Sequence, residues 1–223
     1  MIVRIDESTD SRLADYRNVP DPELIERGGI FVAEGRLVVR RLLEGGRMRA
    51  RSVMLTESAY AALQDAIERH PALAVYIVPQ AVMNAISGFN IHRGCLAIGE
   101  RPAPHDWHAL VRGARTLVIL ERIGNADNVG AIFRNTAAFG ADAVLLGPGC
   151  TDPLYRKAIR TSMAAALTIP FAAAVPWPSM LADLRSKGVA VIGMTPDTSA
   201  PPLDRVRDQL RVDNPVAIVA GHE

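Results

Sequence analysis

The segment NADNVGAIFRNTAAFGAD, residues 125–142, decides the fold because it stands between two apolar runs. TLVILE (116–121) precedes it and AVLLG (143–147) follows it, and both runs are typical of buried β-strands. Between them we expect a helix at about 128–139, which ends at Gly140, a residue suited to the position after a helix. A strand, a helix and another strand in this order predict a parallel β-sheet with right-handed crossovers.

Two polar residues in this segment, Asn128 and Arg134, allow three interpretations. A phosphate cradle at the helix N-terminus is the weakest, because GNADNVG lacks both the G-x-x-x-x-G-K-[ST] and the G-x-G-x-x-G patterns. In a purely structural account, Asn128 caps the helix, Gly130 lets it approach the sheet, and Arg134 extends to solvent. In the third interpretation, both residues serve a polar site at the strand–helix junction. Arg134 lies about 9 Å further along the helix axis than Asn128, and its long side chain covers part of that distance.

The rest of the C-terminal part continues the alternation of apolar strands and helices. Thr151 and Pro153 indicate a helix cap and a first helical residue, followed by the helix LYRKAIRTSMAAAL. The next expected elements are LTIPF, a helix in PSMLADLRSKG, and the strands VAVIGM and PVAIVA. From about residue 116 onward we therefore expect an α/β domain whose parallel sheet is covered on both faces.

The first hundred residues also alternate between α and β patterns and predict a separate, smaller α/β domain. FVAEGRLVVRRLLEGG (31–46) is typical of a helix that stops at its glycine pair. RSVML, AVYIVP and GCLAIGE are expected strands, whereas ESAYAALQDAIERH and QAVMNAISG are expected helices. Residues 101–115, RPAPHDWHALVRGAR, contain two prolines and are predicted to be a linker.

The composition is that of an ordinary globular protein, with 223 residues, 49% hydrophobic and 22% charged. No apolar run reaches about 18 residues, so we expect no membrane span, and the charged N-terminus does not resemble a signal peptide. Cys95 and Cys150 lie far apart in the sequence without metal-type spacing. We therefore expect a reduced, cytoplasmic protein without a metal site.

The basic residues gather in two clusters, although the net charge is only +1. Six arginines fall between positions 36 and 51: Arg36, Arg40, Arg41, Arg47, Arg49 and Arg51. Arg156, Lys157 and Arg160 form a second cluster on one face of the helix expected after Pro153, near the carboxyl ends of the strands. Both could follow a phosphate backbone. The competing account is a solvated helix face whose arginines pair with nearby acids.

Asn128-Val129-Gly130-Ala131-Ile132-Phe133-Arg134, an N-x-G-x-x-x-R pattern after an apolar strand, resembles the first motif of the SpoU (TrmH-like) RNA ribose 2′-O-methyltransferases, of the SPOUT class. AFGADAVLLG, RKAIRTSMAAALTIPF and PVAIVAGHE resemble later segments of that family in the same order. FVAEGRLVVRRLLEGG and IHRGCLAIGE look like its RNA-binding N-terminal domain, which is similar to a ribosomal L30e protein. The resemblance covers nearly the whole chain.

This resemblance implies an RNA-binding, L30e-like domain at 1–100, a linker at 101–115, and at 116–223 a methyltransferase domain of the trefoil-knot type. It makes Arg134 the residue that helps to activate the ribose 2′-hydroxyl. Asn128 would then shape the site, Glu223 would support the loop of the second motif, and Gly221 would contact the cofactor, S-adenosylmethionine. We expect RNA contacts from Arg36, Arg40, Arg41, Arg156, Lys157 and Arg160.

The resemblance also implies a homodimer that acts on rRNA or tRNA. Since the family continues beyond the position of Glu223 with the segments that thread its knot and wrap its cofactor, we expect the given sequence to lack them. The competing function is a non-catalytic RNA-binding protein on the same fold. A nucleotide-binding oxidoreductase is disfavoured, because no glycine fingerprint is present.

Overall fold

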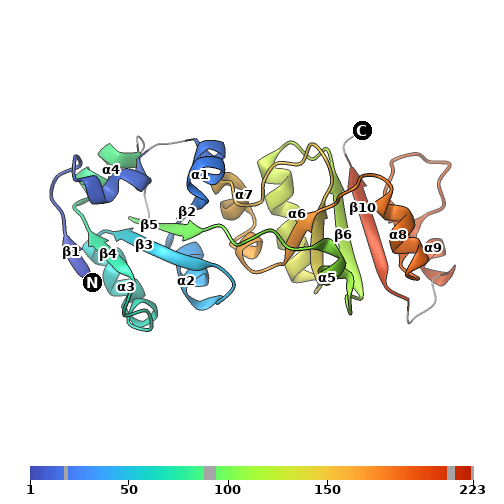
Figure 1. The fold of residues 1–223 in the computed structure, drawn as a ribbon, viewed down its shortest axis with the longest axis horizontal. Helices are drawn as coiled ribbons and strands as arrows, with labels where there is room; N and C mark the ends of the chain where they lie inside the picture. Colours follow the sequence, from blue (N-terminus) through green and yellow to red (C-terminus); the bar gives the residue numbers. More distant parts are fainter. Residues whose placement is uncertain (18–19, 88–93, 210–213, 222–223) are drawn as a thin grey trace. The chain divides into compact units, whose positions relative to one another are not determined.

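The computed structural model describes residues 1–17, 20–87, 94–209 and 214–221, and the chain forms two compact units (Figure 1). Unit 1 consists of Met1–Pro102 together with Pro153–Thr168. Unit 2 consists of Ala103–Asp152 and Ile169–Glu223. Each unit contains its own five-stranded sheet.

Unit 1 is built on a mixed sheet with the strand order β1-β4-β3-β5-β2. β1, β4 and β3 are parallel, whereas β5 runs antiparallel to both β3 and β2. The strands are β1 (Ile2–Arg4), β2 (Ile30–Glu34), β3 (Arg49–Leu55), β4 (Ala74–Ile77) and β5 (Cys95–Glu100). The helices are η1 (Ser11–Tyr16), α1 (Asp21–Gly28), α2 (Arg36–Glu44), α3 (Glu57–Ile67), α4 (Gln80–Ser87), α7 (Arg156–Thr161) and η2 (Ala165–Leu167).

The start of FVAEGRLVVRRLLEGG is a strand, and the prediction of one continuous helix over 31–46 was wrong. Ile30, Phe31, Val32 and Ala33 are all buried in β2 and pair with β5, so both of their faces are covered. Gly35, with φ +94°, then ends the strand and precedes α2. β1, η1 and α1 were not predicted from the sequence.

Unit 2 has an all-parallel sheet with the order β8-β7-β6-β10-β9. The strands are β6 (Thr116–Glu121), β7 (Ala143–Leu146), β8 (Phe171–Ala173), β9 (Ala190–Gly193) and β10 (Val216–Gly221). The helices are α5 (Trp107–Val111), α6 (Ala126–Ala138), α8 (Met180–Ser186) and α9 (Leu203–Gln209). The parallel sheet predicted from the 125–142 segment is therefore confirmed.

The segment 101–115 contains α5, whose side chains pack into the core of unit 2. Trp107 is only 4% exposed, and its indole Nε1 donates to the carbonyl oxygen of Val175 at 2.7 Å. A buried tryptophan with a satisfied N–H fixes its segment in place. The segment expected as a linker thus contributes to the fold of unit 2.

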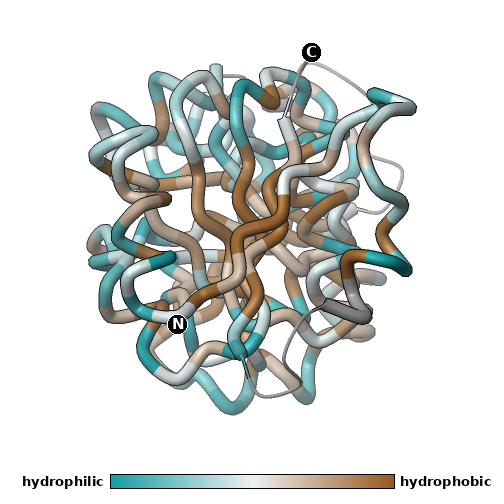
Figure 2. The backbone as a smooth tube through the Cα atoms, turned by 90° about the vertical axis from the view of Figure 1, so that its right-hand side faces the viewer, coloured by the Kyte–Doolittle hydropathy of each residue, from teal (hydrophilic) through white to brown (hydrophobic). Residues whose placement is uncertain are grey.

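Hydrophobic residues concentrate on the strands, and the hydrophilic colours of Figure 2 lie mainly on the outer loops and helices. The core of unit 1 includes Leu13, Met54, Met83 and Ile98, and that of unit 2 is centred on Leu117, Ile119, Leu145 and Ala217. Along the described residues, no helix is both long and apolar enough to cross a bilayer.

Candidate functional site at the carboxyl edge of the parallel sheet

The order of strands in unit 2 reverses direction beside β6. From β6 the chain proceeds outward through β7 to β8, and it then returns on the other side of β6 as β9 and β10. Open α/β sheets bind ligands outside the carboxyl ends of the strands at such a switch point. Here those ends are Glu121 of β6 and Gly221 of β10, which are partners in the strand register. The topology thus identifies one edge of one sheet as the candidate site.

Two loops at this edge hold each other in place. The loop after β6 donates from Arg122 N to Pro148 O at 2.9 Å, and the loop after β7 donates from Thr151 N to Ile123 O at 3.0 Å. The hydroxyl of Thr151 also donates to Gly124 O at 2.6 Å. This set of bonds fixes both loops without using the side chains of α6.

Arg122 lies in this edge with φ +53°, in the left-handed region that non-glycine residues rarely adopt. Such a conformation costs on the order of 1–3 kcal/mol and persists only where the surroundings enforce it. The backbone N–H of Arg122 is held by Pro148, and its side chain is exposed. Residues of this kind concentrate at ligand sites, which agrees with the position at the switch point.

Glycines let the backbones at this edge come close together. A Cβ added to Gly147, directly after β7, would lie 2.7 Å from the carbonyl oxygen of Leu120. Gly149 has φ +75°, and a Cβ there would lie 3.3 Å from the Arg122 side chain. By contrast, a Cβ on Gly221 would meet Glu121 only at ordinary contact distances of 3.7 Å or more. Gly147 and Gly149 are therefore required by the fold, whereas Gly221 is exposed and no close backbone contact requires a glycine there.

Glu121 is a site residue that the sequence analysis missed. Its carboxylate oxygen Oε1 accepts a hydrogen bond from Trp177 Nε1 at 3.0 Å, and both residues are half-buried. A carboxylate held at the switch point can orient a polar ligand by hydrogen bonding. Glu121 could have been predicted as a site residue, because it is an acidic residue at the carboxyl end of a predicted parallel strand. No sequence pattern indicated Trp177.

Helix α6 begins two residues earlier than predicted, and Asn125, not Asn128, is its N-cap. The Asn125 side chain accepts from Asp127 N at 2.8 Å. The capping role considered for Asn128 was therefore wrong, since an N-cap must stand outside the first helical turn. Asn128 is exposed within that first turn. The proposal that Asn128 shapes the site does not depend on a capping role.

Arg134 is exposed in the third turn of α6. The helix is anchored by Val129, Gly130, Phe133 and Thr136, all buried. Arg134 is about 9 Å further along the axis than Asn128 and about 240° around it, so the two residues lie on one helix but not on one face. A shared ligand would have to extend along the helix.

The segment Arg156–Arg160 was expected in the C-terminal domain, but it belongs to unit 1, where α7 packs on β2. The helix starts at Arg156, and the predicted start at Pro153 with Thr151 as the cap was wrong. Thr151 bonds Gly124 instead. Asp21 of α1 accepts both Arg156 N at 3.1 Å and Arg156 Nε at 2.9 Å. Lys157 and Arg160 are exposed.

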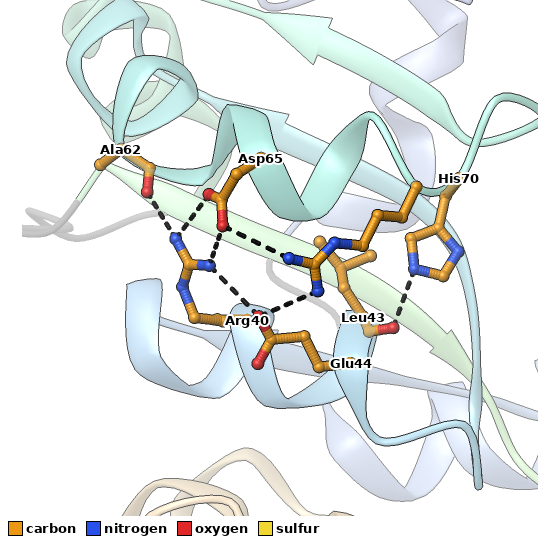
Figure 3. A network of polar contacts seen from close by, with 7 residues as sticks. Arg40, Leu43, Glu44, Ala62, Asp65 and His70 are labelled. Carbon is orange, nitrogen blue, oxygen red and sulfur yellow. Dashed lines mark hydrogen bonds and ion pairs between the residues drawn. The ribbon is translucent and has the colours of Figure 1, made fainter.

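On α2, Arg40 is committed to an ion-pair network, as Figure 3 shows. Its guanidinium donates to the two oxygens of Asp65 at 2.6 and 2.8 Å, to Ala62 O at 2.8 Å, and to Glu44 at 3.2 Å. The bonds from Arg40 lower the pKa of Asp65 from 3.8 to about 2. Of the two accounts of the basic cluster, Arg40 therefore fits the one in which arginines pair with nearby acids. Arg36 and Arg41 are exposed.

The second half of the chain matches the model of the SpoU rRNA Methylase family over residues 115–223. A tRNA/rRNA methyltransferase of Mycobacterium bovis is 38% identical over 195 residues, which cover 86% of this chain and 67% of the relative. The chain belongs to the SpoU methylase family.

Solved structures of RNA methyltransferases share the fold. The AdoMet-bound rRNA methyltransferase from Sinorhizobium meliloti superposes with a TM-score of 0.76 at 19% identity, covering 100% of this chain and 82% of the other. A structure described as an RNA 2′-O ribose methyltransferase gives 0.71 at 21% identity, covering 99% and 82%. The predicted α/β fold class, with a small N-terminal α/β domain and a parallel C-terminal sheet, is confirmed, and the N-terminal sheet proves to be mixed.

The region of this SpoU-family chain that matches the family model contains the whole switch point, helix α6 and Gly221. Glu223, predicted as a site residue, lies outside the described residues. Over those residues, no group of three or more histidines, cysteines, aspartates or glutamates is placed to hold a metal ion. Burial raises the pKa of the Cys95 thiol to about 12, so at neutral pH it is no nucleophile.

Proposed function

We propose that this SpoU-family chain transfers the methyl group of S-adenosylmethionine to a ribose 2′-hydroxyl of structured RNA, either rRNA or tRNA. The observation that carries the proposal is the switch point of the parallel sheet, in which Glu121 and Gly221 stand side by side within the family-matched region. The AdoMet-bound relative with the same fold supports the choice of cofactor.

The residues at this edge fit such a cofactor. Gly221 is exposed and carries no side chain, so a ligand can approach its backbone, and Glu121 offers a carboxylate to hydroxyl or amino groups. Gly221 and Glu121 are therefore the residues we propose to hold it, with Trp177 keeping the Glu121 carboxylate in position. When bound, the cofactor supplies an activated methyl group on a positively charged sulfur.

The reaction forms a bond between the ribose 2′-oxygen and the methyl carbon while the bond from that carbon to sulfur breaks. The 2′-hydroxyl proton has to leave. Arg134 is a poor acceptor for it, because guanidinium keeps its proton in proteins. We infer that Arg134 orients the hydroxyl and stabilises negative charge on its oxygen, while an RNA phosphate takes the proton. Asn128 and Glu223 are proposed to shape and support the site.

Substitution of Arg134 tests this assignment. We expect Arg134→Ala to lower the turnover number for tritiated-methyl transfer to RNA by about 100-fold or more. The substitution removes the hydrogen-bond donor that stabilises negative charge on the reacting oxygen. Calorimetric AdoMet affinity should stay within about twofold, as the proposed cofactor residues are unchanged. Arg185→Ala, an exposed arginine on α8 of the same unit, is the matched control. Wild-type turnover in Arg134→Ala at saturating RNA would contradict the assignment.

Ribose-specific mapping of the tritium label decides between 2′-O-methylation and base methylation. The second candidate function, RNA binding without catalysis, would be favoured if the chain bound RNA but neither bound AdoMet nor transferred methyl groups. We also propose that the chain acts as a homodimer and that residues 1–100 contribute to RNA binding; sedimentation and binding measurements test these two points.

A further inference from the structure

A cavity of about 510 Å³ lies in unit 1 at the amino ends of β3 and β4. Its walls are the turn from α2 to β3, the first half of β3, and the loop from α3 to β4. The lining residues are Leu42, Leu43, Gly46, Arg47, Met48, Arg49, Ala50, Arg51, Arg69, His70, Pro71, Ala72 and Leu73. Volumes of this order are typical of sites for small ligands or single nucleotides.

The charged groups that line this cavity are all basic. Four arginines contribute, Arg47, Arg49, Arg51 and Arg69, and no aspartate or glutamate is among the lining residues. The cavity at the opposite edge of the same sheet, about 450 Å³, differs because Arg4 shares it with Asp6 and Glu57. The first cavity therefore has the charge that an anionic ligand requires.

A β-bulge lies at one of these arginines and next to a second, and both are exposed. The register of β3 against β5 shifts between Ala50 and Ser52, which leaves Arg51 as the extra residue. Such a bulge re-aims side chains and is common beside functional sites. The side chains of Arg49 and Arg51 are 80% and 54% exposed, while Ser52 is buried and bonds Tyr16 at 2.7 Å. The sheet thus keeps its core contact and also presents both arginines outward.

The ion pairs of these arginines are loose. Arg49 lies 3.6 Å from Glu100, Arg51 lies 3.3 Å from Asp15, and Arg69 lies 3.8 Å from Glu44. Exposed pairs of this kind contribute at most about 1 kcal/mol, so their carboxylates are readily exchanged for another anion. Arg40 is different, because two oxygens of Asp65 hold it at 2.6 and 2.8 Å (Figure 3).

The wall of the cavity that carries His70 is held in place. His70 Nε2 donates to the carbonyl oxygen of Leu43, near the end of α2, at 2.8 Å, which joins the loop before β4 to that helix (Figure 3). Burial lowers the pKa of the half-buried Arg47, because a guanidinium loses hydration there. A bound anion would add a favourable charge interaction for the Arg47 guanidinium without moving the wall.

We propose that this cavity binds the phosphodiester backbone of the RNA substrate, through Arg49, Arg51 and Arg69 at the rim and Arg47 inside. The identity of the anion as RNA rests on the proposed function. Planar guanidinium groups suit phosphate oxygens, which they bind with two parallel hydrogen bonds. The RNA surface predicted along α2 is thereby moved from Arg40 to the far end of that helix.

The test is fluorescence anisotropy of a labelled RNA hairpin with the full chain at several salt concentrations. The variant R49Q/R51Q/R69Q should bind about 10- to 100-fold more weakly at about 0.15 M salt, and the slope of log affinity against log salt should fall by about 2–3. In methyl transfer its KM for RNA should rise while kcat stays the same. Melting curves by circular dichroism establish that the variants are folded.

The matched control is R4Q/R12Q/R17Q, which removes the same charge from the same unit away from the cavity. It should bind within about twofold of wild type. Equal losses in both triple variants, or no loss in either, would overturn the proposal, as would a wild-type chain that does not bind RNA. If only the cavity variant lost RNA affinity but the wild-type chain transferred no methyl group, the result would support RNA binding at the cavity and count against the proposed function.

Discussion

Single side chains fix the loops that form the candidate site. Asn125 closes the first turn of α6 by accepting from Asp127 N, and Thr151 joins the loop after β7 to Gly124. Neither residue has to touch a ligand to matter, because both determine where the backbone of the switch-point edge lies. The residues with proposed chemical roles, Glu121 and Arg134, depend on this frame.

Removing the cap tests that frame. Asn125→Ala should lower the free energy of unfolding of unit 2 by about 1 kcal/mol, because the N–H of Asp127 loses its acceptor. Urea denaturation followed by tryptophan fluorescence measures the change, since both tryptophans, Trp107 and Trp177, are in unit 2. Asn135→Ala, at an exposed position on the same helix, should change stability by less than about 0.5 kcal/mol. Equal effects of the two substitutions would contradict the capping role.

At this scale the sequence located the end of α6 to within about two residues of Gly140 but misplaced the caps, and the role of Arg134 stays a prediction. Asn128 and Thr151 are both good capping residues, yet Asn125 caps α6, and the first N–H of α7 is accepted by Asp21, which lies outside that helix. Asp21 is 135 positions from Arg156 in sequence, so no local pattern could reveal that contact. The partnership of Trp177 with Glu121 was hidden for the same reason.

Pairs of elements in unit 1 are connected by charge as well as by packing. Arg40 on α2 reaches the backbone and the Asp65 side chain of α3, and it also bonds Glu44 on its own helix. A carboxylate with a pKa of about 2 keeps its charge in moderate acid. The contact between α2 and α3 is therefore expected to persist until the pH falls well below 4.

Acid unfolding tests this pair. Because the pKa of Asp65 is lower in the folded protein than its ordinary 3.8, the stabilisation is complete above that value and is lost as the pH falls toward about 2. Asp65→Asn should therefore destabilise unit 1 at pH 5 and have little effect near pH 2, as measured by urea denaturation with far-ultraviolet circular dichroism. Arg40→Gln should act in the same way, and the double variant should be less destabilised than the sum. Additive effects would show that the pair is not coupled.

Most strands and helices with clear periodicity were predicted correctly, including α3, α4, β5 and β10. The wrong predictions of secondary structure occurred where one hydrophobic pattern spans two elements. FVAEGRLVVRRLLEGG contains a buried strand and a helix, and its continuous apolar residues suit both until the positive φ of Gly35 separates them. The short β1 and α1 lack periodicity, since tertiary pairing with β4 and packing on β2 maintain them.

For the whole molecule, the main surprise is that unit 1 is discontinuous. Pro153–Thr168 packs with Met1–Pro102, and Ala158 and Ile159 of α7 are 0% and 1% exposed there. Periodicity could predict a helix near this position, but it could not say which core would receive it. The apolar face of α7 fits either unit as far as sequence alone is concerned.

Truncating a side chain on the apolar face of α7 should destabilise β2, although the two elements are more than 100 positions apart in the sequence. Ile159→Ala should cost about 2–5 kcal/mol in unit 1, because it leaves a hole in a buried contact. Hydrogen exchange of the amides in β2 should accelerate accordingly, while β7 in unit 2 keeps its protection. Arg160→Ala, at an exposed position of the same helix, serves as the comparison. Unchanged exchange in β2 would mean that α7 does not stabilise it.

The discontinuity of unit 1 has a consequence for the order in which the chain matures on the ribosome. After Pro102 has left the exit tunnel, the segment that completes the first unit has not yet been made, and it follows only at Pro153–Thr168. At about 5–20 residues per second, synthesis from Pro102 to Thr168 takes on the order of 3–13 s. During that interval β2 lacks its contact with α7, so the nascent chain exposes apolar surface that the finished unit buries.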